Sequence, residues 1–381
     1  MKFSDIPWHK SIADSLRHLA DSGRIPHAIL LGGPSGTGKM LMARIFAQYV
    51  HCRSPRDGEP CGVCPDCRQH QSFNHPDTHF IYPVYKKDSN HQAVAADYIA
   101  QWKDFLRAHP YMEPELWPSA LGSEGKQVMI YTFESEAILR KASVTAFSSE
   151  KKIFLIWQPE KMNAEAANKL LKILEEPFAD TIFILVSDAP EELLPTIRSR
   201  VSSIFMPPPS TDTIADWLVS SHGVDPEQAE YAARMAEGNV AKALDFEGQR
   251  GEKDEFGELF RDMMRRAWQR DVAALKEISE KIAEMKREKS IRFLAYCSRM
   301  LRENFVYNFG EPSLVRLSPD EEAFSSRFAR FVNIVNIGGL EREFSKATAD
   351  IARNANGKIV ALDLLLRLMT LLRQGAAAYV S

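Results

Sequence analysis

The chain of 381 residues contains no run of 18 apolar residues, and its first five residues lack the apolar centre of a signal peptide. Cysteine is scarce: there are five, and four of them fall between positions 52 and 67 instead of being spread as a disulfide framework would be. These absences argue against a membrane-spanning protein and against a disulfide-rich exported domain. We therefore expect a cytoplasmic protein that makes no use of a membrane.

A strong excess of either charge is also missing, since the net charge is −3. A protein that held DNA alone through many phosphate contacts would be more basic. We expect any DNA contact to be shared with partners. Apolar residues make up 45% of the chain and charged residues 26%, which is enough for the cores of two or three soluble domains.

Uninterrupted apolar runs at 27–31, 152–157 and 181–186 are typical of buried parallel strands. Helical patterns follow the first two runs, at 39–51 and at 163–177. Strands that alternate with helices predict a parallel sheet covered on both faces.

Three domains are expected from the composition along the chain. Residues 1–208 form the α/β domain, and a polar stretch at about 85–126, rich in Trp, Pro and His, interrupts its alternation as an insertion of open role. Pro207-Pro208-Pro209-Ser210 reads as a linker. Nearly everything after it is helical, with a small lid at 209–250 and a larger all-α domain at 251–381.

A phosphate-binding loop follows the first strand and opens the first helix. The candidate nucleotide-binding residues are Gly33, Gly36, Thr37, Gly38 and Lys39. Glycines let backbone N–H groups converge on phosphates, and the lysine would reach the terminal phosphates. The alternative is a glycine turn that only joins strand to helix.

Three groups that an ATPase needs are absent. Met40 stands where a Ser or Thr hydroxyl would bind Mg²⁺, and a thioether is a poor ligand for this hard cation. Trp157 and Gln158 replace the Asp-Glu pair expected after the next central strand. Glu160 follows two residues later, where we do not expect it to substitute. The pattern predicts a chain that does not hydrolyse ATP, and leaves binding of ATP or ADP in doubt.

The clustered cysteines, Cys52, Cys61, Cys64 and Cys67, have the spacing C-x8-C-x2-C-x2-C. Four thiolates in a short loop predict a closed, structural Zn²⁺ site. An iron–sulfur cluster and unligated thiols are the alternatives. Nearby histidines, His70, His75 and His79, are expected to have surface or packing roles, because four cysteines already complete the shell.

Several segments together resemble one family, the AAA+ clamp-loader subunits of bacterial DNA polymerase III, and most closely its delta-prime type. The segments are 26–30, the loop 33–39, the cysteine cluster 52–67, 75–77, the Leu-Leu-Lys-x-Leu-Glu-Glu-Pro region at 167–177, and Ser199-Arg200-Val201. The resemblance spans roughly residues 9–247 strongly and the C-terminal helices more loosely. Two departures stand out: Val201 replaces the family's cysteine, and Ala241 replaces the lid's arginine.

This resemblance implies a non-catalytic subunit of a hetero-oligomeric ring within the polymerase III holoenzyme. Gamma/tau and delta subunits would be its partners, the C-terminal helices would form the ring's collar, and the ring would load a sliding clamp onto primed DNA. Arg200 would act as a trans arginine finger on a neighbour's ATP. Arg198 is the other candidate for this role, and the alternative role for Arg200 is a surface salt bridge.

Two other functions stay open at this point. One is an active clamp-loader ATPase of the gamma/tau type, against which Met40, Trp157 and Gln158 argue. The other is a stand-alone, zinc-containing nucleic-acid-binding module, which the mildly acidic charge does not favour.

Overall fold

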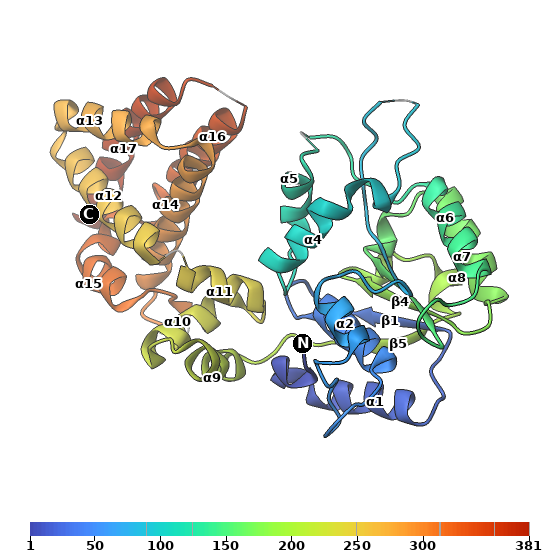
Figure 1. The fold of residues 1–381 in the computed structure, drawn as a ribbon. Helices are drawn as coiled ribbons and strands as arrows, with labels where there is room; N and C mark the ends of the chain where they lie inside the picture. The colour runs from blue at the N-terminus through green and yellow to red at the C-terminus, as the bar shows by residue number, and fades with distance from the viewer. Residues whose placement is uncertain (89, 124, 249, 312–313, 354, 381) are drawn as a thin grey trace. The chain divides into compact units, whose positions relative to one another are not determined.

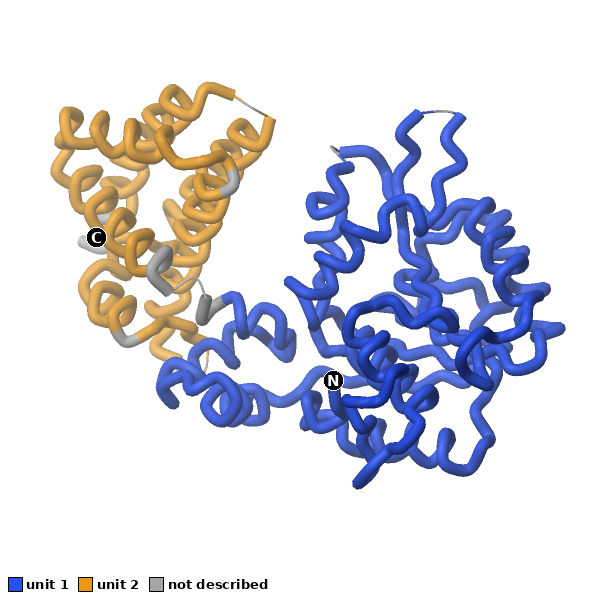
Figure 2. Tube along the Cα trace, viewed as in Figure 1, with its two compact units in different colours: residues 1–245 blue, residues 246–381 orange. Residues whose placement is uncertain are grey.

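The computed structural model describes residues 1–380 apart from 89, 124, 249, 312–313 and 354. The chain divides into two compact units, residues 1–245 and residues 246–381, which Figure 2 colours separately. Among the described helices, none combines the length and the apolar character that a membrane span requires.

The first unit is built on a five-stranded sheet with the order β2-β3-β4-β1-β5. Figure 1 labels three neighbouring strands of this sheet, β4, β1 and β5. Every strand pair is parallel, as expected, and Ile29 lies opposite Ile184 where β1 and β4 adjoin. The strands are β1 (Ala28–Gly32), β2 (Thr78–Ile81), β3 (Lys152–Trp157), β4 (Thr181–Ser187) and β5 (Ser202–Phe205).

Helices cover both faces of this sheet. Alternate strand residues, among them Leu30, Phe154 and Leu185, form one core with α6 (Thr132–Ser143), α7 (Ala164–Glu175) and α8 (Pro195–Arg198). The opposite face contacts α2 (Lys39–His51), every residue of which is buried except Val50. Because successive strand residues point to opposite faces, uninterrupted apolar strands require this double cover.

Further elements precede, connect or follow the strands and helices named above. They are η1 (Phe3–Asp5), η2 (Pro7–His9), α1 (Lys10–Asp21), α3 (Pro65–Gln71), η5 (Pro159–Lys161) and η6 (Pro190–Glu192). Asn163 caps α7 by accepting from the N–H of Ala166 at 2.8 Å.

The insertion at about 85–126 folds into η3 (Ala95–Tyr98), α4 (Ile99–Ala108), η4 (Pro114–Leu116) and α5 (Trp117–Leu121). It is less polar in its packing than its sequence suggests. Trp102 and Trp117 are fully buried beside Trp157 at the end of β3, and the Trp102 ring stacks on Tyr82 at 4.1 Å. The insertion is therefore anchored to the sheet edge by large aromatic rings.

The lid consists of α9 (Thr211–His222), α10 (Pro226–Ala236) and α11 (Val240–Gly248). Ser210 and Asp225 cap the first two helices through their side-chain oxygens.

The second unit is entirely helical in its described residues. Its elements are α12 (Arg250–Gln269), α13 (Val272–Glu284), α14 (Arg287–Tyr307), α15 (Pro319–Phe328), η8 (Ala329–Phe331), α16 (Ile337–Ala352) and α17 (Gly357–Val380). Leu364, Leu365, Leu368 and Leu372 of α17 are buried in its core together with Cys297. The expected architecture, an α/β domain with a parallel sheet followed by all-α segments, is confirmed in the described residues.

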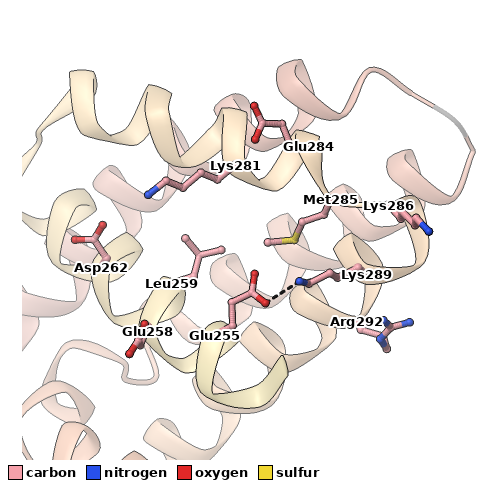
Figure 3. Close-up of a pocket in the computed structure, with 10 residues that line it drawn as sticks. All are labelled: Glu255, Glu258, Leu259, Asp262, Lys281, Glu284, Met285, Lys286, Lys289 and Arg292. Carbon is pink, nitrogen blue, oxygen red and sulfur yellow. Dashed lines mark hydrogen bonds and ion pairs between the residues drawn. The ribbon is translucent and has the colours of Figure 1, made fainter. Parts of the chain in front are cut away.

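A hollow of about 830 Å³ lies between α12, α13 and the start of α14 (Figure 3). Acidic side chains of α12 face lysines across it, and Glu255 pairs with Lys289 at 2.7 Å. Because both signs of charge line this hollow, it favours neither an anionic nor a cationic ligand.

Candidate functional site

The phosphate loop lies between β1 and α2, where its sequence context predicts it. Gly36 and Gly38 have φ values of +72° and +92°, in a left-handed region that glycine adopts without strain. Thr37 is fully buried, and its hydroxyl donates to the carbonyl of Pro34 at 3.1 Å. The loop thus keeps the backbone shape that its glycines provide.

Lys39 forms an ion pair with a carboxylate of the same chain. The Lys39 Nζ lies 2.6 Å from a carboxylate oxygen of Asp188, just after β4, and also donates to the Pro34 carbonyl. Burial lowers the pKa of Lys39 and raises that of Asp188, while their mutual attraction opposes both shifts. Asp188 was not identified from the sequence, since no local motif marks it.

Asp188→Asn should destabilise the first unit, because it leaves a buried ammonium without its counter-charge. Removing one partner of a buried ion pair costs about 3 kcal/mol or more. Urea unfolding would measure this loss. The double variant Lys39→Met, Asp188→Leu is the control and should lose less stability than Asp188→Asn. A single variant within about 0.5 kcal/mol of the parent, the range of ordinary surface changes, would contradict the role of this pair.

The three residues that the sequence predicts in place of ATPase groups are all buried in the protein. Met40 is 2% exposed on α2, and Trp157 is 1% exposed among the aromatic rings of the insertion. Gln158 is buried as well and adopts φ +53°, with its N–H donating to the carbonyl of Val186. These positions offer a thioether, an indole and an amide where a motor would present a hydroxyl and two carboxylates.

Glu160 lies closer to the loop than the sequence suggests. Its carboxylate accepts from the Ser187 hydroxyl at 2.8 Å, and its charge acts on Lys39. Burial raises the pKa of Glu160 to about 7, so at neutral pH this carboxyl is only partly ionised.

Two further residues touch the loop backbone and were also missed from the sequence. The indole of Trp8 donates to the carbonyl of Thr37 at 3.0 Å. From the lid, the Val240 N–H donates to the carbonyl of Gly36 at 2.9 Å. Backbone groups at the loop are therefore engaged by the N-terminal segment and by the lid.

The four clustered cysteines converge as predicted. Their sulfur atoms all lie within 4.8 Å of one another, and Cys61 Sγ is 3.9 Å from Cys67 Sγ. Zinc bound at about 2.3 Å from each of four tetrahedral sulfurs would place them about 3.8 Å apart. Backbone N–H groups of Cys61, Cys64 and Cys67 point at neighbouring sulfurs, which favours thiolate charge. The cluster can hold a metal ion.

A second group, His51, His70 and His75, lies buried beside the cysteines. The rings of His51 and His75 stack at 4.2 Å with an interplanar angle of 17°. Because nitrogen lone pairs lie in the ring plane, stacked rings do not aim them at one shared ion. His51 instead bonds His70 at 2.9 Å and the Lys151 carbonyl at 2.9 Å. His70 and His75 are buried and stack on each other at 4.5 Å, and the half-buried His79 packs against Phe154.

Arg200 follows α8 and is a partly exposed side chain, at 37%. Its guanidinium pairs with Glu175 at 2.7 Å and donates to the carbonyl of Thr196 at 3.0 Å. Arg198, its rival, is exposed at the end of α8. Arg200 therefore has an ion-pair partner within its own unit. Exposed ion pairs of this type contribute little to stability.

Comparison with known proteins gives consistent matches to DNA polymerase III subunits. A DNA polymerase III subunit delta' of Bacillus subtilis is 31% identical over 238 residues, 62% of this chain and 57% of that protein. A DNA polymerase III subunit gamma/tau of Mycobacterium tuberculosis is 27% identical over 232 residues, 60% of this chain and 33% of that protein. The chain thus spans little more than half the length of the first of these relatives, and a third of the second.

A solved structure of a gamma subunit-related protein from Thermotoga maritima covers 95% of this chain and 99% of its own, at 14% identity and a TM-score of 0.43. That likeness is too low to add to the fold described above. The family model described as DNA polymerase III, delta subunit, matches residues 8–210, more than half of the chain. The chain therefore belongs to the DNA polymerase III, delta subunit family.

Proposed function

We propose that this chain is an ATPase-disabled, delta-prime-type subunit of a DNA polymerase III clamp loader. The observation that carries the proposal is the ion pair between Lys39 and Asp188. In this pair a carboxylate of the chain itself balances the charge of the lysine that would otherwise bind phosphate. The buried side chains of Met40, Trp157 and Gln158 support it, because none can hold Mg²⁺ or polarise water.

In this proposal the subunit works through its partners. Gamma/tau and delta subunits surround it in a ring, to which the helices of 251–381 contribute a collar. Arg200 stabilises charge on a neighbour's ATP, and the assembled ring places a sliding clamp on primed DNA. The near-neutral charge of the chain supports shared contact with DNA. The same composition supports a cytoplasmic location.

We also propose that the metal of the cysteine cluster is Zn²⁺. Four sulfur donors at nearly tetrahedral separations suit zinc, and a shell of four protein ligands is structural. The cluster joins the end of α2 to the start of α3, because Cys52 follows the one helix and Cys64 caps the other. Its role is to hold the irregular loop 53–63 between these helices.

The isolated chain should not hydrolyse ATP. Steady-state turnover should stay far below about 1 s⁻¹, the low end of typical enzymes. The matched control is Lys39→Ala, because any trace activity that persists in this variant comes from a contaminant. Turnover near 1 s⁻¹ that Lys39→Ala abolishes would instead identify an active gamma/tau-type subunit. Co-purification with gamma/tau and delta subunits tests the proposed assembly separately.

A further inference from the structure

The insertion reaches over the phosphate loop between its two anchored helices. After α4 the chain passes through Tyr111 and Glu113 before it enters η4 and α5. The Tyr111 ring packs close to Gly38, where an added Cβ would meet it at 3.5 Å. Both ends of this segment are held at the sheet edge by the buried rings of Trp102 and Trp117. The segment therefore extends from a fixed base toward the loop.

Three aromatic rings from different parts of the chain meet there. Trp8 comes from the N-terminal segment, Tyr111 from the insertion and Trp217 from α9 of the lid. The ring centroids lie 5.2–5.8 Å apart, and Trp217 makes edge contacts with both others. Edge-to-face rings at this spacing attract one another beyond simple burial. The cluster ties the lid to the insertion.

A hydrogen bond at Glu113 also connects the insertion to the lid. Its carboxylate is 9% exposed and accepts from the Asn239 side-chain amide at 3.3 Å. The other atom of this amide, Asn239 Oδ1, caps α11 by accepting from the N–H of Lys242 at 3.0 Å. Asn239 thus uses its acceptor to begin a lid helix and its donor to bind the insertion.

Asn239 also packs directly against the loop. A Cβ added at Gly36 would lie 1.9 Å from Asn239 Oδ1, so a glycine is required there by the lid as well as by its positive φ. The next residue, Val240, makes the hydrogen bond to the Gly36 carbonyl. The lid therefore contacts the backbone of the phosphate loop directly.

We propose that the insertion is an intramolecular latch, which holds the lid against the phosphate loop through Tyr111 and Glu113. In a nucleotide-dependent motor, the bound nucleotide would connect loop and lid. Here the chain's own side chains make that connection, so the lid keeps one position without nucleotide. The proposal concerns the first unit alone and holds whether or not the chain joins a clamp loader.

The Val240 N–H is a direct reporter of this latch, because its acceptor belongs to the loop and not to the lid. Hydrogen–deuterium exchange of the full chain, resolved to single amides, should show Val240 exchanging roughly tenfold faster in Glu113→Ala, as expected for loss of one partly buried hydrogen bond. The Ala243 N–H donates to the Asn239 carbonyl within the lid and should keep its protection. That difference separates release of the lid from its unfolding.

Two matched variants sharpen the test. Glu113→Gln keeps an oxygen that accepts from Asn239 and should exchange like the parent. Glu115→Ala, at an exposed position two residues away, should also leave Val240 unchanged. If Glu113→Ala does not fold, Asn239→Ser breaks the same bond from the lid while keeping a good helix cap. Unchanged exchange at Val240, an equal rise at Ala243, or the same rise in Glu115→Ala would overturn the latch.

Discussion

Arg200→Ala should slow ATP hydrolysis roughly 10³-fold at the site it serves in a reconstituted clamp-loader ring, because an arginine finger neutralises charge that spreads over the phosphoryl oxygens. The effect on the whole ring would be smaller, since other sites keep their own fingers. Steady-state hydrolysis and clamp loading by the ring are the measurements. Arg200→Lys should fail nearly as badly, because one ammonium cannot reproduce the planar, bidentate guanidinium.

The intramolecular partner of Arg200 supplies the decisive control. In the structure Arg200 pairs with Glu175, and both side chains are substantially exposed. If Arg200 serves only this pair, Glu175→Ala should reproduce the defect of Arg200→Ala. If it acts on a neighbour's ATP, Glu175→Ala should leave hydrolysis nearly intact. Arg198→Ala should be mild, and all these variants should assemble normally, because exposed ion pairs add little stability. Normal hydrolysis by the Arg200→Ala ring would rule out the trans role.

Removal of one cysteine from the cluster should abolish metal binding. Elemental analysis should find about one zinc per chain in the parent and almost none in Cys64→Ser, because a structural site needs all four ligands. Serine keeps a side-chain oxygen that can cap α3, so the helix start should survive. The loop 53–63 should become sensitive to limited proteolysis.

Cys297→Ala provides the matched control for this experiment. Cys297 is fully buried in the core of the second unit, far along the chain from the cluster. Its loss should leave the zinc content unchanged. Parent protein that contains no metal when purified without chelator would contradict the zinc assignment, and full zinc content in Cys64→Ser would contradict the ligand set.

Local signals in the sequence predicted much of the first unit. The apolar runs at 152–157 and 181–186 are strands in the structure, and the helix after the loop spans Lys39–His51 as predicted. The convergence of the four cysteines was also predicted. Each of these features depends on residues within a few positions of one another, so the pattern of side chains carries the information.

The insertion shows where this reasoning fails. Its Trp, Pro and His content suggested a polar stretch, yet Tyr98, Trp102, Phe105 and Trp117 are buried. Tyr and Trp combine an apolar ring with a polar group, so they occur both in solvated loops and in cores. They become buried only where another surface packs against them. That surface is Tyr82 and Trp157, which come from the ends of two strands and cannot be recognised from the insertion alone.

The sequence by itself predicted a phosphate loop, a parallel sheet, a four-cysteine cluster and the absence of three ATPase groups. Only the tertiary structure decided which groups contact this loop. Asp188 meets Lys39 because the parallel strands β1 and β4 end side by side. Glu113 meets Asn239 across 126 positions because the insertion and the lid converge on the same loop. Contacts of this kind depend on how whole helices and strands pack together. That packing cannot be recognised from the residues that neighbour each contact in the sequence.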